Sequence, residues 1–113
     1  MMRACALGFA AAIAVAASAP VTAQTVTTRV KAGALLAVCG ESRPACLTYV
    51  LGTMDSLALA GFADAAYCVP KTANNDQITA ATIRYLRAHP EQQEANAASS
   101  VFAALRENYP CRR

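Results

Sequence analysis

Four cysteines, all beyond an apolar N-terminal segment, most limit what this chain can fold into. They are Cys39, Cys46, Cys68 and Cys111, while Cys5 lies inside the apolar segment. An even number of cysteines in a short exported chain predicts two disulfides, because the environment is oxidising and so small a domain buries little surface. A structural zinc site is not favoured, because such sites use closely spaced cysteine pairs that this sequence lacks.

The N-terminal segment has the pattern of a signal peptide. Arg3 supplies a positive charge, an apolar run extends from Ala4 to Ala17, and small residues follow as far as Ala23. The run is shorter than the roughly 20 residues that a membrane-spanning helix needs. We therefore expect residues 1–23 to be a cleaved signal peptide, with cleavage before Gln24. Residues 24–113 should then form one periplasmic domain that is not held in a membrane.

Charge and motifs exclude several classes of function. The chain has ten Lys and Arg against seven Asp and Glu, so removal of Arg3 with the signal peptide leaves a net charge near +2. The sequence has no basic patch of the kind that binds nucleic acid. The one histidine, His89, precedes a proline and is expected to be a surface turn residue. There is no CxxC motif and no glycine-rich phosphate loop. We expect no enzymatic activity, no metal and no cofactor.

The spacing of apolar residues predicts four helices and no strand. The expected ranges are 31–39, ending at Gly40, then 45–61, then a helix from the polar residues between Thr72 and Asp76 to Ala88, and finally 90–109. Gly52 inside the second helix predicts the close approach of another backbone. The stripe expected to be buried in the second helix is Leu47, Val50, Leu51, Met54, Leu57 and Ala58, and that in the fourth is Ala95, Ala98, Phe102, Leu105 and Tyr109.

Short connectors between these helices favour an all-α fold, a small disulfide-linked antiparallel bundle of four helices. In such a bundle Cys39 and Cys46 lie at one end, and Cys68 and Cys111 lie at the other. Of the three possible pairings, only Cys39 with Cys46 and Cys68 with Cys111 joins cysteines at the same end.

Several short motifs, taken in order, resemble a known family. They are Leu35 to Cys39, Cys46 to Gly52, Cys68-Val69-Pro70, Tyr85 to Glu91, and Ala103-Ala104-Leu105 followed by Tyr109-Pro110-Cys111. This succession is similar to the Rap/Tai immunity proteins, as is Gln77 near the start of the third helix. The resemblance covers nearly the whole mature chain. It implies a small periplasmic helical protein that blocks a peptidoglycan amidase effector of type VI secretion, often as a homodimer.

The resemblance does not identify the surface that selects a partner. We expect contacts from exposed polar residues of the third helix and the turn after it: Asn75, Gln77, Arg84, Arg87 and Gln92. The leading hypothesis is an inhibitor that binds a cognate amidase effector. The alternative is a periplasmic stress chaperone or an orphan helical binding protein, and a small hydrolase is least favoured.

Overall fold

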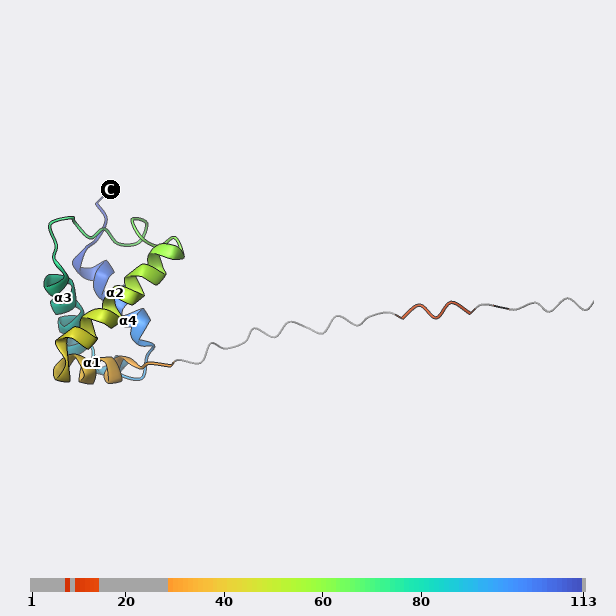
Figure 1. Cartoon of the computed structure of the whole chain (residues 1–113), viewed down its shortest axis with the longest axis horizontal. Helices are drawn as coiled ribbons and strands as arrows, with labels where there is room; N and C mark the ends of the chain where they lie inside the picture. Colours follow the sequence, from red (N-terminus) through yellow and green to blue (C-terminus); the bar gives the residue numbers. More distant parts are fainter. Residues whose placement is uncertain (1–7, 9, 15–28, 113) are drawn as a thin grey trace, which may run out of the picture.

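The helices found in the described residues lie within residues 29–112. The computed structural model describes this range together with Gly8 and residues 10–14 (Figure 1). The helices are α1 (Ala32–Glu41), α2 (Arg43–Leu59), α3 (Asn75–Ala88) and α4 (Ala97–Asn108), with a 3-10 turn, η1 (Pro90–Gln92), before α4. Strand pairing in these residues is limited to isolated bridges, so the all-α class is confirmed. Most of the expected signal peptide, and its cleavage site, lie outside the described residues.

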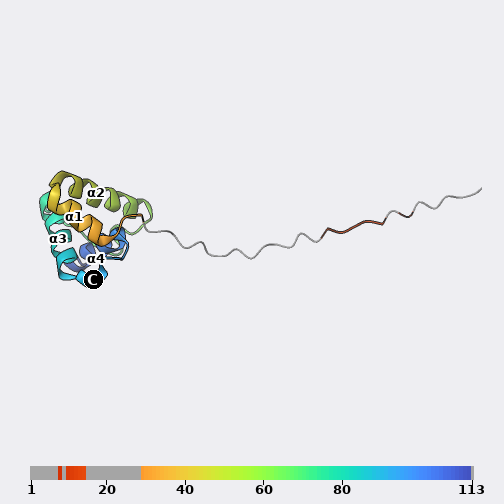
Figure 2. The same ribbon diagram turned by 90° about the horizontal axis from the view of Figure 1, so that it is seen from below.

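The three longer helices alternate in direction, and α1 crosses one end of them. In Figure 1, α2 rises from the lower left, α3 descends on the left and α4 rises again, while α1 lies across the bottom. The view from below in Figure 2 shows α2 on one side of the domain and α3 and α4 on the other. α1 contacts all three of the other helices. No helix among the described residues is long and apolar enough to cross a membrane.

Both expected disulfides are present, one at each end of this arrangement. Cys39–Cys46 joins the end of α1 to the start of α2, across a sequence separation of 7. Cys68–Cys111 joins the connector after α2 to the C-terminal segment, across a separation of 43. The predicted pairing is confirmed, and Figure 1 shows the second junction at the end of the domain opposite α1.

α3 begins where the sequence predicts, because its first turn is capped on both sides. The Asn74 Oδ1 accepts a hydrogen bond from the Gln77 backbone N–H at 2.8 Å, and the Gln77 Oε1 accepts one from the Asn74 N–H at 2.9 Å. This reciprocal pair is a capping box. Two buried threonines, Thr79 and Thr82, are satisfied within the helix, since each hydroxyl donates to the carbonyl four residues earlier.

Loss of this cap should destabilise the domain. We expect Asn74→Ala to lower the free energy of unfolding by about 1 kcal/mol, because the Gln77 N–H loses its acceptor. Chemical denaturation monitored by circular dichroism would measure the change. Asn75→Ala is the matched control, because Asn75 is exposed and its side chain caps nothing, so its effect should stay within about 0.5 kcal/mol. Equal effects of the two changes would contradict the capping role.

The start of the fourth helix was predicted too early. The chain makes η1 after His89, and α4 begins only at Ala97, where the Asn96 Oδ1 accepts hydrogen bonds from Ala98 N and Ser99 N at 2.9 and 3.3 Å. Residues 93–97 bond instead to the segment that leads into α1, through Ala97 N to Val30 O at 2.9 Å and Ala32 N to Ala95 O at 2.8 Å. Those tertiary hydrogen bonds replace helical ones.

The buried faces of α2 and α4 are also rotated from the predicted stripes. In α2 the buried residues are Cys46, Val50 and Thr53, whereas Ala58 is exposed. In α4 the buried face contains Val101, Ala104 and Leu105 among others, whereas the predicted Ala95 is exposed.

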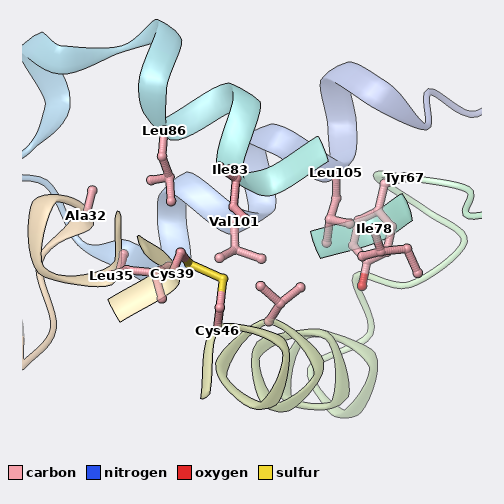
Figure 3. Close-up of a cluster of buried hydrophobic side chains, with 12 residues drawn as sticks. Ala32, Leu35, Cys39, Cys46, Tyr67, Ile78, Ile83, Leu86, Val101 and Leu105 are labelled. Carbon is pink, nitrogen blue, oxygen red and sulfur yellow. A yellow bond between two sulfur atoms is a disulfide. The ribbon is translucent and has the colours of Figure 1, made fainter. Parts of the chain in front are cut away.

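The core lies between α2 on one side and α3 and α4 on the other, with side chains from all of them pointing inward (Figure 3). The residues labelled there are Ala32, Leu35, Cys39, Cys46, Tyr67, Ile78, Ile83, Leu86, Val101 and Leu105.

The close backbone approach predicted at Gly52 occurs at Gly33 instead. A Cβ built on Gly33 would lie 3.2 Å from Gln93 Cβ and 3.3 Å from the Gln93 carbonyl oxygen. No atom lies within 4 Å of a Cβ built on Gly52, which faces open space on α2. The prediction for Gly52 was wrong, because helix α2 has no neighbour on that side.

These two glycines should respond to alanine in opposite directions. We expect Gly52→Ala to raise the free energy of unfolding by about 0.5–1 kcal/mol, because alanine favours the helix and meets no obstacle. Gly33→Ala should lower it by about 1–3 kcal/mol, because the added methyl is overpacked against Gln93. Thermal and chemical unfolding of the two variants would measure both effects. A loss of stability in Gly52→Ala would show that its surface is covered in solution.

Candidate functional site

The five residues expected to contact a partner lie on α3 and η1, but they do not form one face. Gln77 and Arg84 are seven residues apart on α3, which places them on the same side of the helix. Arg87 is exposed one turn further along. Asn75 lies two positions before Gln77 in the first turn of α3, which places it on another side of the helix. Gln92 lies in η1, where its Oε1 accepts a hydrogen bond from the Tyr85 hydroxyl at 3.3 Å.

Gln77 and Arg84 line one surface hollow. Its volume is about 550 Å³, and its lining residues are Pro70, Thr72, Ala73, Gln77, Ala80, Arg84 and Tyr109. One wall is therefore the outer face of α3, and the other is built from the connector before α3 and the residue after α4. Asn75, Arg87 and Gln92 do not line it.

Two further hollows adjoin this first hollow. One, of about 510 Å³, shares Pro70 and Tyr109 with it and is otherwise lined by Cys68, Asn108, Pro110 and Arg112. The other, of about 160 Å³, shares Arg84 and is otherwise lined by Tyr85, Ala88, His89, Glu107 and Asn108.

The part of this surface formed by Pro70, Thr72, Tyr109 and Arg112 was not predicted from the sequence. The Cys68–Cys111 pairing was the signal for it, because that bridge brings the connector beside the C-terminal segment.

Arg84 has a weak contact and no carboxylate partner among the described residues. Its Nη2 donates to the Asn108 Oδ1 at 3.5 Å, the long limit of a hydrogen bond. The ion pair found in the described part of the chain is Lys31 with Glu94, between the segment before α1 and the turn before α4. The guanidinium of Arg84 is thus exposed and available to an outside group.

His89 has a structural environment at the end of α3. Its Nδ1 lies 2.8 Å from the Tyr85 carbonyl oxygen, and its ring stacks on the Tyr85 ring with centroids 4.0 Å apart. These contacts fix the imidazole against the last turn of the helix. Within residues 29–112 no group of three or more His, Cys, Asp or Glu side chains is placed to hold a metal ion.

A separate, more apolar hollow of about 550 Å³ lies beside α2. It is lined by Thr48, Tyr49, Gly52, Thr53, Ser56, Leu57 and Ala98. Burial raises the pKa of the Tyr49 hydroxyl above its ordinary value, and a hydrogen bond with Thr53 opposes this rise. Burial therefore favours the protonated form of the Tyr49 hydroxyl.

The helices and the two disulfides define the class of this protein as a small all-helical domain stabilised by disulfides. Within that class, the chain belongs to the Rap1a immunity proteins, whose family model matches residues 31–111. The matched range contains all the helices found in the described residues and both disulfides, and it confirms the resemblance seen in the sequence. Members of such a family protect against a secreted effector. No curated protein and no solved structure matches the chain.

Proposed function

We propose that this chain is a periplasmic immunity protein that binds and inhibits a peptidoglycan amidase effector delivered by a type VI secretion system. The observation that carries the proposal is the family match across residues 31–111. The predicted signal peptide supports a periplasmic location, where peptidoglycan is found and where oxidising conditions maintain disulfides. The chain acts by binding, without a cofactor.

The surface of α3 and η1 supplies the contacts in this proposal. Asn75, Gln77, Arg84, Arg87 and Gln92 lie there together with the three adjoining hollows. A specific inhibitor complex usually buries about 1,600 Å² in total, in which a few residues supply most of the binding energy. Gln77 and Arg84 are the strongest of the five, because both line the first hollow.

Protection of cells tests the function. Bacteria that export the cognate amidase, meaning the exported amidase whose gene adjoins this one, should lyse, and co-expression of this chain should restore growth. A version without residues 1–23 is the control and should not protect, because it stays in the cytoplasm. Continued lysis with the full chain would contradict the proposal. Suppression of client aggregation without protection would favour the stress chaperone instead.

A further inference from the structure

The charges around the first two hollows are all of one sign. We name these two hollows, which share Pro70 and Tyr109, the α3–α4 cleft. Among the described residues, the charged ones that line the cleft are Arg84 and Arg112, and none of those that line either half carries a carboxylate. Glu107 lines the smaller hollow on the other side of Arg84, beyond ion-pair distance of any described arginine. An anionic group that entered the cleft would therefore meet the cations Arg84 and Arg112 and no carboxylate of the described lining residues.

Two side chains in the first half of the cleft have hydrogen-bond donors with unused capacity. The Gln77 Oε1 already accepts from the Asn74 N–H at 2.9 Å, so the amide nitrogen of Gln77 is the end that remains to donate. Arg84 offers guanidinium N–H groups whose contact within the described residues is the 3.5 Å one to Asn108. Thr72 adds a hydroxyl. Donors with unused capacity fit acceptor oxygens, and a carboxylate is a protein acceptor that arginine can bind through two parallel hydrogen bonds.

The wall opposite α3 is held in place before any partner arrives. The Cys68 N–H donates to the Tyr109 carbonyl at 2.7 Å, and the Cys68–Cys111 disulfide joins the same two segments covalently. The Ala73 N–H donates to the Pro70 carbonyl at 3.0 Å, which closes the turn that lines the first hollow. A cleft with fixed walls loses little conformational entropy on binding, which favours affinity.

We propose that the α3–α4 cleft receives an acidic segment of the effector protein, with a carboxylate paired to Arg84 and another to Arg112. This inference rests on the proposed immunity function and adds the chemistry of the partner's contact surface. The apolar hollow beside α2 is a weaker choice, because nothing in the structure shows what covers it. The cleft, by contrast, has charge and donors that select one kind of occupant.

Charge reversal in the cleft tests the proposal against the cognate amidase. Arg84→Glu and Arg112→Glu should each weaken binding about 100-fold by calorimetry, because a paired carboxylate would then face a like charge. Arg43→Glu is the matched control: Arg43 is exposed at the start of α2, at the end of the domain away from the cleft, and its effect should stay within about twofold. Circular dichroism and denaturation should show that all three variants fold.

Two arms separate failure of the cleft from failure of the function. Tight amidase binding that Arg84→Glu and Arg112→Glu leave unchanged would overturn the cleft and leave the immunity role standing. If the unaltered chain binds no amidase, the immunity role fails, and titration with a hexaglutamate peptide then decides on the cleft. Saturable NMR shifts at Ala80, Arg84 and Tyr109 that Arg84→Glu abolishes would support it. Absent shifts, or equal shifts at Arg43, would overturn it.

Discussion

Replacement of Cys68 and Cys111 together by serine is expected to lower the free energy of unfolding by about 4 kcal/mol. The bridge closes a sequence separation of 43, so its loss frees a long loop in the unfolded chain. Both residues are half-buried, so serine hydroxyls at these positions remain within reach of water. The loss of stability should therefore come from the greater conformational freedom of the unfolded chain more than from lost packing in the folded one.

Guanidinium chloride unfolding of the double variant, at the pH used for the unaltered chain, measures this effect. The Cys39–Cys46 bridge closes a separation of only 7, for which the same loop model gives about 2.5 kcal/mol. Both of its residues are buried, so their replacement by alanine would also remove packed atoms from the core. A loss below about 1 kcal/mol for the Cys68 and Cys111 pair would contradict the account of that bridge.

Leu105→Ala should have the second largest effect on stability, a loss of about 3 kcal/mol. Leu105 is 1% exposed on α4, and its side chain lies in the core near Tyr67 and Ile78 (Figure 3). Truncation would remove buried methyl groups and leave a cavity that the fixed helices cannot fill.

Leu59→Ala is the matched control for this core substitution. Leu59 is the last residue of α2 and is 92% exposed, so the same truncation should change the free energy of unfolding by no more than about 0.5 kcal/mol. Equilibrium denaturation of both variants gives the comparison. Similar losses would show that α4 does not bury the face described here.

α3 could be predicted almost completely from the sequence, because its local signals agree with its packing. Asn74 and Gln77 supply a capping box, and the apolar residues Ile78 and Leu86, which lie at helical spacing, are both buried. When capping, polarity and apolar spacing all favour one orientation of a helix, these local signals suffice to predict its start and its buried face.

The orientations of α2 and α4 could not be read from spacing alone. The apolar residues of α2 are spread around the helix, so their spacing does not identify one buried face. The side that faces the core is the one that carries Cys46, which is buried and joined to α1 by the disulfide. α4 has alanine at both buried and half-buried positions, as at Ala97 and Ala98, so the spacing of its small residues did not identify the buried face. Its start depends on hydrogen bonds to Val30 and Ala32, more than 60 residues away, which no local pattern contains.

The candidate site was predicted in part for the same reason. Gln77 and Arg84 were named as exposed polar residues of the third helix, and both line the first hollow. Pro70, Tyr109 and Arg112 join them only through the fold, since the connector and the C-terminal segment meet where Cys68 pairs with Cys111. The predicted disulfide already implied that meeting, and it is the sequence feature that best locates the cleft.

Titration of the cognate amidase with the oxidised mature chain tests the central claim most directly. Peptidoglycan hydrolysis should fall in proportion to added chain and cease when about one domain is present for each enzyme, as expected for a tight inhibitor. Hydrolysis that continues at its full rate in excess chain would contradict an immunity function.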